Sequence, residues 1–424
     1  MNTKSVKLLK GGVVLSLFAS TLLHATNGDT LIGVGTKSRG MGGAGIGMSH
    51  CAESTLQNPA LITCTKGTSV SFGGTIFMPD ISANMGQAPS KSSSADMNVI
   101  PSIAISQKIN ENWYWGIGMW GTAGMGVDYR DASTSATDSG NMKMVTNLQL
   151  MQFGATLAYT KNNFGIALTP VLQYGALDIN YKDFANNNIG AGVSQDFGTG
   201  YNLGMYYDYG NGLTLGGIYK SKIDMKYNGQ LSNATQPFAT MGIVPGAMED
   251  YLDQPSEMGV GFAYKFDNQA IAFDYKKINW SDARGYKDFG WEDQDVYAIG
   301  YQLKKGKWKY RLGYNHASHP IKEAQSGPSV ISAGNYAQAG GNAINLFNLL
   351  GFPATAENHY TIGGGYDISK NMYVDVAYVY APETTTTMKT ITGFNSGTGD
   401  LYTGNSTVKH SEQALSLQLS YRFF

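Results

Sequence analysis

Charge is scarce in this chain of 424 residues. Only 14% of the residues are Asp, Glu, Lys or Arg, whereas about 25% is usual in soluble domains. The net charge is −1 and no basic patch stands out, so nothing indicates a nucleic-acid partner. After the amino terminus the chain also lacks long uninterrupted apolar runs, which excludes a membrane-spanning helix.

What the chain has in abundance is glycine and tyrosine, with 54 and 27 residues. The mean hydropathy is only −0.21. A chain that is poor in charge and still not strongly hydrophobic suits a barrel with one lipid-facing and one polar face.

The amino terminus has the layout of a secretory signal peptide. Lys4, Lys7 and Lys10 precede an apolar stretch over residues 11–23, and small-residue cleavage character follows. The stretch is short for a spanning helix, which needs about 20 apolar residues. We predict that residues 1–25 are removed and that the mature chain begins near Thr26. A retained amphipathic anchor is the alternative.

Only two cysteines occur, Cys51 and Cys64. An isolated pair in an exported chain is typical of a disulfide. The metal alternative is weaker, because two cysteines beside His50 form a poor ligand set. We therefore expect a small-loop disulfide, and neither a metal nor a cofactor.

From residue 68 onward the pattern alternates with a period of two. Near the carboxyl terminus, apolar residues at 415, 417, 419, 421 and 423 alternate with Ser416, Gln418, Ser420 and Arg422. Successive strand residues point to opposite faces, so such segments have one apolar and one polar face. About fourteen segments of this kind are predicted, at 68–79, 97–107, 113–127, 143–160, 163–181, 197–210, 212–228, 255–267, 269–281, 289–304, 306–316, 357–368, 371–381 and 410–424.

The connections between these segments alternate in length. Short turns, for example at Asn162-Asn163 and Asp267-Asn268, alternate with longer stretches such as 182–196, 317–356 and 382–409. Short turns at one end, long loops at the other and an even strand number are typical of bacterial outer-membrane barrels. An open edge in lipid would leave backbone groups unpaired, so the sheet must close. Aromatic residues near strand ends predict interfacial girdles; they are Trp113, Trp115, Trp120, Tyr219, Trp280, Trp308 and Tyr380.

Residues 26–67 lack this alternation and are rich in glycine. Leu56, Leu61 and Ile62, together with the expected disulfide, indicate a compact unit rather than a disordered tail. We predict three parts of the chain: a signal peptide (1–25), a plug or hatch domain (26–67) and a closed antiparallel β-barrel of about fourteen strands (68–424).

A family resemblance supports this division. The stretch 35–44, G-T-K-S-R-G-M-G-G-A, followed by Asn58-Pro59-Ala60, resembles the amino-terminal hatch of the FadL/TodX family of long-chain fatty acid and aromatic hydrocarbon transporters. Further matches, each weaker by itself, follow along the chain in the same order as in the family, at 101–103, 113–129, 279–282, 311–314 and 359–361.

The resemblance implies a hatch inside a fourteen-stranded barrel and passive uptake of hydrophobic molecules. Extracellular loops would capture the cargo, an interior pocket would hold it, and a gap at a kinked third strand would release it sideways. The residues implied in the hatch and its gating are Lys37, Arg39, Gly40, Gly42, Gly43, Asn58, Pro59 and Ala60. Lys37, Arg39 and Arg311 are also candidates to contact a cargo carboxylate. Alternatively, Lys37 and Arg39 tie the hatch to acidic wall residues such as Asp375.

The third strand carries five glycines: Gly116, Gly118, Gly121, Gly124 and Gly126. Glycine weakens strands and permits bulges, which favours a kink; the alternative is that these glycines make room for the hatch. The 182–196 loop is short for a family that builds its capture groove from the third and fourth loops. A run in the 317–356 loop, predicted as a short helix, is the candidate capture surface or else a lid, through Ile344, Leu346, Phe347, Leu349, Leu350 and Phe352.

Three other functions compete with this hypothesis. A general diffusion porin requires an open lumen, an outer-membrane lipid hydrolase requires a nucleophile motif that is not recognisable here, and an adhesive barrel requires no ligand. We therefore predict a non-enzymatic transporter in the outer membrane of a Gram-negative bacterium. Its partners would be a fatty acid or hydrocarbon ligand, membrane lipid with lipopolysaccharide, and the barrel-assembly machinery, and the resemblance suggests a monomer.

Overall fold

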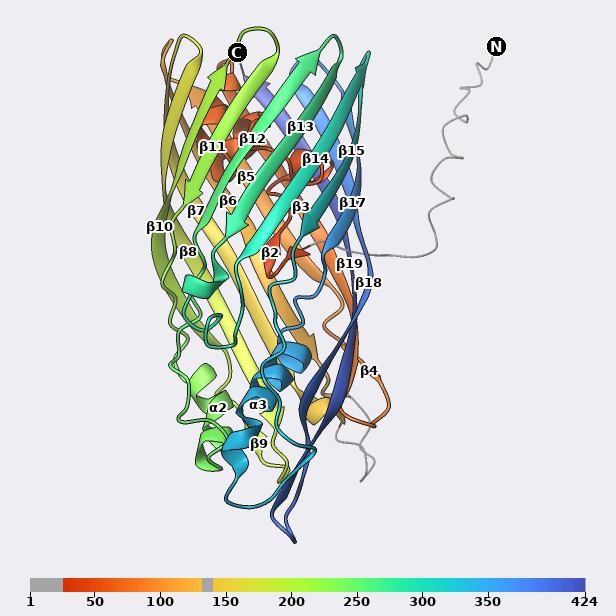
Figure 1. Ribbon diagram of the computed structural model, residues 1–424. Helices are drawn as coiled ribbons and strands as arrows, with labels where there is room; N and C mark the ends of the chain where they lie inside the picture. The colour runs from red at the N-terminus through yellow and green to blue at the C-terminus, as the bar shows by residue number, and fades with distance from the viewer. Residues whose placement is uncertain (1–25, 132–139, 424) are drawn as a thin grey trace, which may run out of the picture.

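The computed structural model describes residues 26–131 and 140–423, which form one closed barrel of fourteen antiparallel strands (Figure 1). The predicted signal peptide and Phe424 lie outside the described residues. The barrel strands are β3 (Thr68–Asn84), β5 (Asn98–Lys108), β6 (Trp113–Asp128), β7 (Val145–Lys161), β8 (Phe164–Lys182), β10 (Ser194–Asp208), β11 (Leu213–Lys220), β12 (Glu257–Phe266), β13 (Gln269–Ile278), β14 (Gln294–Lys305), β15 (Trp308–Ala317), β17 (Asn358–Asp367), β18 (Met372–Asn395) and β19 (Asp400–Phe423). The last strand pairs with the first, from Thr407 opposite Asn84 to Phe423 opposite Thr68, and closes the barrel. The predicted fold and strand number are confirmed.

The alternation of the sequence appears as two faces of the barrel wall. Along β19, Leu415, Leu417 and Leu419 are 44%, 58% and 43% exposed, whereas Ser416 and Gln418 are buried. Because strand side chains alternate in direction, the exposed apolar row belongs in the hydrocarbon of the membrane and the polar row faces the lumen.

The two ends of the barrel differ. Short turns and the carboxyl terminus lie at the upper end in Figure 1, and the long loops lie at the lower end with α2 (Leu231–Thr240) and α3 (Gly340–Leu346). Outer-membrane barrels place short turns in the periplasm and long loops outside the cell. The upper end in Figure 1 is therefore the periplasmic end, and the lower end is the extracellular end. Within residues 26–131 and 140–423, no helix is long and apolar enough to cross a membrane.

Several predicted strand boundaries were wrong. The predicted 382–409 loop is instead a β-hairpin, because β18 continues to Asn395 and β19 begins at Asp400. It projects past the other loops (Figure 1). Beyond the membrane neither face must be apolar, so polar runs such as Thr384–Thr387 hide the strand pattern. In addition, β11 ends at Lys220 rather than 228, and β14 begins at Gln294 rather than 289.

The prediction of aromatic girdles was correct for some residues only. Trp113 and Trp308, next to the short turns, are 40% and 52% exposed on the outer surface. Trp120 and Trp280 are buried and belong to no girdle. The side chain of Trp120 folds over Gly118, and Trp280 lies in a loop packed against residues inside the barrel.

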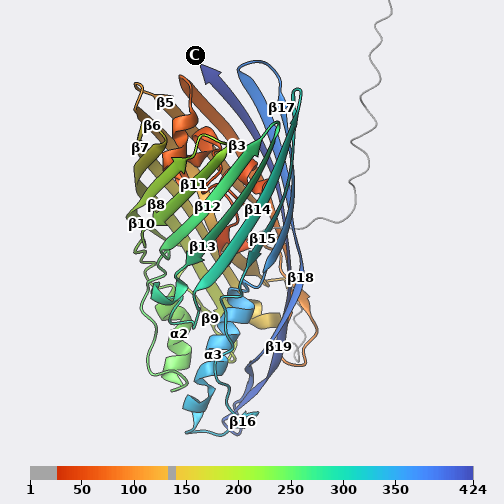
Figure 2. The ribbon, with the colours of Figure 1, turned by 45° about the horizontal axis from the view of Figure 1, so that its top comes forward.

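The amino-terminal segment, residues 26–67, runs inside the barrel (Figure 2, red to orange). It contains β1 (Thr26–Asn27), β2 (Thr30–Leu31), α1 (Thr36–Arg39), η1 (Cys51–Leu56) and η2 (Pro59–Cys64). The η2 helix packs against β7, β8 and β10, and α1 packs against β17 and β18. Most of its residues are buried. The remaining short elements are β4 (Lys91–Ser92), β9 (Asn188–Ile189), β16 (Val330–Ile331), η3 (Gly140–Lys143), η4 (Trp280–Asp282), η5 (Tyr336–Ala339) and η6 (Phe347–Gly351).

Candidate functional site: the barrel lumen and an opening in its wall

A buried charge cluster joins the amino-terminal segment to the wall. The Lys37 ammonium bonds to the Glu53 carboxylate and lies 3.8 Å from Oδ2 of Asp375 in β18. Arg311, in β15, places Nη1 2.8 Å from Oδ1 of Asp375. The tie proposed between Lys37 and Asp375 is therefore present. Two cations and two carboxylates balance in this cluster, as buried charges require.

Arg39 has different partners from those expected. Its guanidinium donates to the hydroxyls of Thr75 in β3 and Ser416 in β19, the latter at 3.4 Å. The expected tie to Asp375 is therefore wrong for Arg39. Burial lowers the pKa of Arg39 to about 10, against a smaller opposite effect of Glu53, so the side chain remains a cation at neutral pH.

Gly40 and Gly42 allow the segment to approach the wall closely, and Gly43 allows it to pack on its own Ile32 carbonyl. The Gly42 amide donates to Oγ1 of Thr361 at 3.0 Å, and a Cβ at Gly42 would lie 2.5 Å from the carbonyl oxygen of Tyr314. The φ angles of Gly42 and Gly43 are 68° and 90°, a region that favours glycine. Gly40 faces another glycine in β17, with 3.1 Å between its Cβ position and Cα of Gly363.

The predicted Asn58-Pro59-Ala60 motif starts η2 and fixes it to the wall. The Asn58 side-chain oxygen accepts from the Ala60 amide at 3.2 Å, and Pro59 occupies the first helical position. The side-chain nitrogen donates to the carbonyls of Ile46 at 2.7 Å and Met205, in β10, at 3.0 Å. One asparagine thus caps the helix, holds the preceding loop and contacts the barrel.

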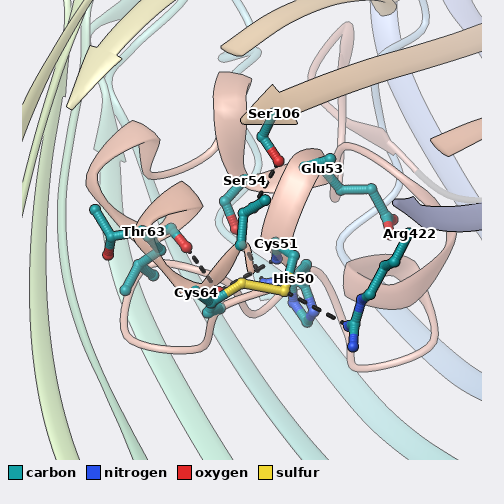
Figure 3. The surroundings of a disulfide bond; sticks show 12 residues. His50, Cys51, Glu53, Ser54, Thr63, Cys64, Ser106 and Arg422 are labelled. Carbon is teal, nitrogen blue, oxygen red and sulfur yellow. Dashed lines mark hydrogen bonds between the residues drawn. A yellow bond between two sulfur atoms is a disulfide. The ribbon is translucent and has the colours of Figure 1, made fainter. Parts of the chain in front are cut away.

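Cys51 and Cys64 form a disulfide bond that links η1 to η2 (Figure 3). Nearby, Oγ of Ser54 accepts from the His50 amide at 3.0 Å. The Arg422 guanidinium of β19 comes within 4.0 Å of Sγ of Cys51. In the part of the chain that the structure describes, no group of three or more His, Cys, Asp or Glu is arranged to hold a metal ion.

A central cavity of about 60 Å³ lies between the segment and the wall. Its lining mixes apolar side chains such as Leu31 with the ion pairs of Glu257, whose carboxylate lies 3.0 Å from Lys220 Nζ and 3.4 Å from Lys276 Nζ. By volume it holds roughly two waters, whereas a cavity known to bind benzene measures about 150 Å³. In this conformation the central cavity is too small for a hydrophobic cargo.

The wall is interrupted at β6, the third strand of the barrel. The pairing of β6 with β5 ends at Trp120, and its pairing with β7 shifts register between Gly121 and Ala123. A bulge of this kind bends a strand and leaves backbone groups unpaired. A second cavity, here called the wall cavity, lies beside the bulge and measures about 450 Å³.

The five glycines of β6 divide into two groups. Gly121, Gly124 and Gly126 line the wall cavity. Gly116 and Gly118 face the interior, where a Cβ at Gly116 would lie 3.4 Å from Ile62 and one at Gly118 would overlap the ring of Trp120. Gly118 thus makes room for Trp120 of its own strand, and Gly116 lies in ordinary contact with the amino-terminal segment.

The run predicted as a short helix in the 317–356 loop is helical, as α3 and η6. It does not present an exposed apolar surface. Of the six proposed capture residues, Ile344 is partly exposed, and the other five are buried. Three asparagines hold this helical cover: Asn342 and Asn345 donate to the Lys389 carbonyl at 2.8 and 3.0 Å, and Asn348 donates to the Phe289 carbonyl at 2.8 Å. The burial of five of the six residues argues against an exposed capture surface at this position.

The sequence did not lead us to predict that residues of the loop after β13 lie inside the barrel. Trp280, Tyr286 and Trp291 are at most 3% exposed and pack with ring centroids 4.7 to 5.1 Å apart. The Tyr286 hydroxyl donates to the Asp29 carboxylate of the amino-terminal segment. Four aromatic residues within an otherwise polar loop, the three above and Phe289, were a sequence signal for an inward-folded loop.

Comparison with known proteins places this geometry in a family. Residues 25–336 match the family model for outer membrane protein transport protein (OMPP1/FadL/TodX). A long-chain fatty acid transport protein of Escherichia coli is 25% identical over 250 residues. That match covers 47% of this chain and 55% of the relative, so the chain spans about half the length of the curated relative it matches.

Solved structures share the fold. A FadL homologue of Pseudomonas aeruginosa has a TM-score of 0.69 at 16% identity, covering 94% of this chain and 100% of the other. The toluene transporters TodX of P. putida and TbuX of Ralstonia pickettii have TM-scores of 0.63 and 0.62 at 16% and 17% identity, each covering 92% of this chain and 99% of the other. At such low identity these likenesses establish the architecture alone.

Proposed function

Because this chain belongs to the OMPP1/FadL/TodX family of outer-membrane transport proteins, we propose that it carries hydrophobic molecules passively across the outer membrane. The cargo is a long-chain fatty acid or a hydrocarbon, taken from the extracellular side and released sideways at β6. The observation that carries the proposal is the interruption of the wall, where β6 bulges at residues 121–123 and a cavity of about 450 Å³ takes the place of continuous β5–β6 pairing.

Release through the wall is favoured because membrane hydrocarbon, and not water, lies outside it. An apolar molecule gains about 0.8 kcal/mol for each methylene that it moves out of water. A path through the wall delivers it to membrane hydrocarbon, whereas an axial path would deliver it to periplasmic water. The glycines at 121, 124 and 126 leave the outer face of the bulge without side chains, which favours passage there.

We propose that residues 26–67 act as the hatch of this transporter. The segment is fixed to five different wall strands: β3, β10, β17, β18 and β19. The contacts are the ion pair of Lys37, the hydroxyl contacts of Arg39, the amide of Gly42 and the side chain of Asn58. A plug tied at so many points argues against a general diffusion porin, whose bore must stay open. The helical cover of α3 and η6 acts as an extracellular lid.

Transport requires no energy source in this mechanism. The central cavity of about 60 Å³ is too small for the cargo, so the amino-terminal part of the hatch must move before cargo passes from the lumen to the wall cavity. The gradient of free cargo drives net flow, and the barrel itself stays rigid because its strands pair into a closed hydrogen-bonded sheet.

Reconstitution tests the proposal. Purified full-length protein in liposomes should speed entry of a fluorescent fatty acid or of naphthalene over empty liposomes, and Gly124→Leu should slow this entry by filling the wall cavity. Gly364→Leu is the matched control, because a side chain there meets no atom within 4 Å. If wild-type protein is no faster than empty liposomes for either cargo, passive uptake is excluded. If Gly124→Leu transports like Gly364→Leu, lateral release at β6 is excluded.

A further inference from the structure

Positive charge is concentrated on one part of the periplasmic rim of the barrel, at the upper end in Figure 1. The turn between β14 and β15 carries Lys304, Lys305 and Lys307, the turn between β17 and β18 carries Lys370, and Arg422 lies near the end of β19. Pairing of β15 with β17, and of β18 with β19, places these segments side by side. We call these cations the basic rim. Because they come from separate segments of a chain whose net charge is −1, the sequence shows no long basic run.

Carboxylates do not balance the basic rim. Asp367 lies 2.6 Å from Nζ of Lys309 and 3.9 Å from Nζ of Lys304, so two lysines share it. Among the described residues, no carboxylate oxygen lies within 4.0 Å of Nζ of the other three lysines in the rim. The neighbouring turn between β12 and β13 adds one charge of each sign, Lys265 and Asp267. The rim therefore keeps an excess of positive charge.

Aromatic side chains lie next to these lysines on the outer surface. Trp308 is the strand partner of Lys305, and the exposed rings of Trp308 and Tyr310 stack with centroids 6.5 Å apart. Tyr366 packs on Trp308 with 4.6 Å between ring centroids, and Nζ of Lys307 lies 5.9 Å from the centroid of the Tyr366 ring. Exposed aromatic rings near strand ends mark the headgroup level of a membrane. Lys305 and Lys307 therefore lie at the boundary between phospholipid headgroups and water.

Another part of the same rim lacks the lysines. The turn between β10 and β11, residues 208–212, has the sequence D-Y-G-N-G and so carries an acidic residue and no basic one. Tyr207 and Tyr209 are nevertheless 45% and 51% exposed there, with ring centroids 4.9 Å apart. The periplasmic interface of this barrel therefore has aromatic residues with and without adjacent cations, and the excess of lysine belongs to the β14–β19 side.

We propose that the basic rim is a binding surface for anionic phospholipids of the inner leaflet of the outer membrane. Lys305 and Lys307 hold the phosphodiester headgroup, and an acyl chain packs along Trp308 and Tyr310 toward the membrane interior. Basic clusters at a membrane boundary attract anionic headgroups, and the short turns place this cluster at the periplasmic leaflet. A soluble polyanion would contact the lysines, but it would gain nothing from the exposed rings beside them.

This partner is distinct from the transported cargo, and the inference does not depend on the proposed function. Because the cations lie on one side of the barrel, bound lipid anchors the β14–β19 side to the inner leaflet more firmly than the side of the β10–β11 turn.

Native mass spectrometry of the full-length protein in a neutral detergent tests the proposal. The probes are phosphatidylglycerol, which is anionic, and phosphatidylcholine with the same acyl chains, which carries no net charge. Wild-type protein should retain phosphatidylglycerol in preference to phosphatidylcholine. Lys305→Gln with Lys307→Gln should reduce this preference by about tenfold or more, whereas Lys305→Arg with Lys307→Arg should preserve it, because the charge is kept.

Two further variants separate the contribution of this surface from that of net charge and from that of the rings. Lys287→Gln with Lys322→Gln removes the same charge from exposed positions in extracellular loops, and its preference should equal that of the wild type. Trp308→Leu should weaken retention of both lipids, because the ring contacts the lipid whatever its headgroup. All the substituted positions are exposed, so the barrel should keep its heat resistance in detergent.

The proposal is overturned if wild-type protein shows no preference for phosphatidylglycerol, if the glutamine pair at 305 and 307 keeps the preference, or if the extracellular pair loses it equally. Unchanged retention of both lipids in Trp308→Leu would also overturn it, because the rim would then bind phosphate without contact to the lipid chain. None of these measurements involves uptake, so a failure of transport in liposomes leaves the basic rim unaffected.

Discussion

The indole nitrogen of Trp291 donates a hydrogen bond to the side-chain oxygen of Asn348 at 3.0 Å. Trp291 packs with Trp280 and Tyr286 inside the barrel, and Asn348 belongs to the helical cover of the lumen. This bond, together with that from Asn348 to the Phe289 carbonyl at 2.8 Å, makes the helical cover and the interior aromatic residues neighbours in one contact network.

The Asn348→Ala substitution should loosen the lid. It leaves the Trp291 indole nitrogen and the Phe289 carbonyl unpaired in a buried site, which costs about 1–3 kcal/mol for each lost partner. We expect faster hydrogen exchange in residues 340–352 and faster uptake of cargo into liposomes. Asn187→Ala, in an exposed loop on the same side of the barrel, is the control and should leave both rates unchanged. Unchanged hydrogen exchange in residues 340–352 of Asn348→Ala would contradict the role given to Asn348.

The Arg39→Ala substitution should loosen the hatch without unfolding the barrel. Its two hydroxyl partners lie 2.7 Å apart and can satisfy each other after the guanidinium is gone, so no buried charge is stranded. We expect higher small-ion conductance in planar bilayers, with heat resistance of the barrel in detergent retained.

Arg130→Ala is the control for this substitution, since Arg130 is exposed in the loop after β6. Conductance of Arg39→Ala equal to that of the control would show that the contacts of Arg39 do not hold the hatch in place.

The sequence predicted the barrel because lipid and lumen impose a period of two on every spanning strand. It did not predict the extension of β18 and β19, because beyond the membrane Thr384–Thr387 need no apolar face. Opposite charges suggested the pair of Lys37 and Asp375, but the same reasoning gave Arg39 the wrong partner, since uncharged hydroxyls carry no such signal. The contact between Asp29 and Tyr286 joins residues 257 positions apart, and only the folded chain brings them together.

The Cys51–Cys64 disulfide should stabilise the hatch rather than the barrel. It closes a loop over a sequence separation of 13, for which the chain-entropy estimate is about 3 kcal/mol. The double substitution Cys51→Ser and Cys64→Ser should therefore speed hydrogen exchange and proteolysis in residues 50–65, with strand exchange in β10–β15 unchanged. Equal acceleration in the strands would mean that the hatch and the barrel unfold as one unit.

Docking of the amino-terminal hairpin, which β1 and β2 form over residues 26–31, should weaken as pH rises. Burial raises the pKa of Asp29 from an ordinary value of 3.8 to about 6, although the hydrogen bond from Tyr286 acts in the opposite direction. The docked hairpin therefore binds the Asp29 proton more tightly than the withdrawn hairpin does. Docking is most favourable below about pH 4 and loses up to about 3 kcal/mol as pH rises through about 6.

Hydrogen exchange of residues 26–31, corrected for intrinsic rates, measures this effect between pH 4 and pH 7.5. Wild-type protein should show a rising opening equilibrium over that window, and Asp29→Asn should show a flat one, because the amide does not titrate. Asp131→Asn, an exposed loop residue, should follow the wild type. A pH dependence that survives in Asp29→Asn would assign the titration to another group and exclude Asp29 as the cause of the pH-dependent docking.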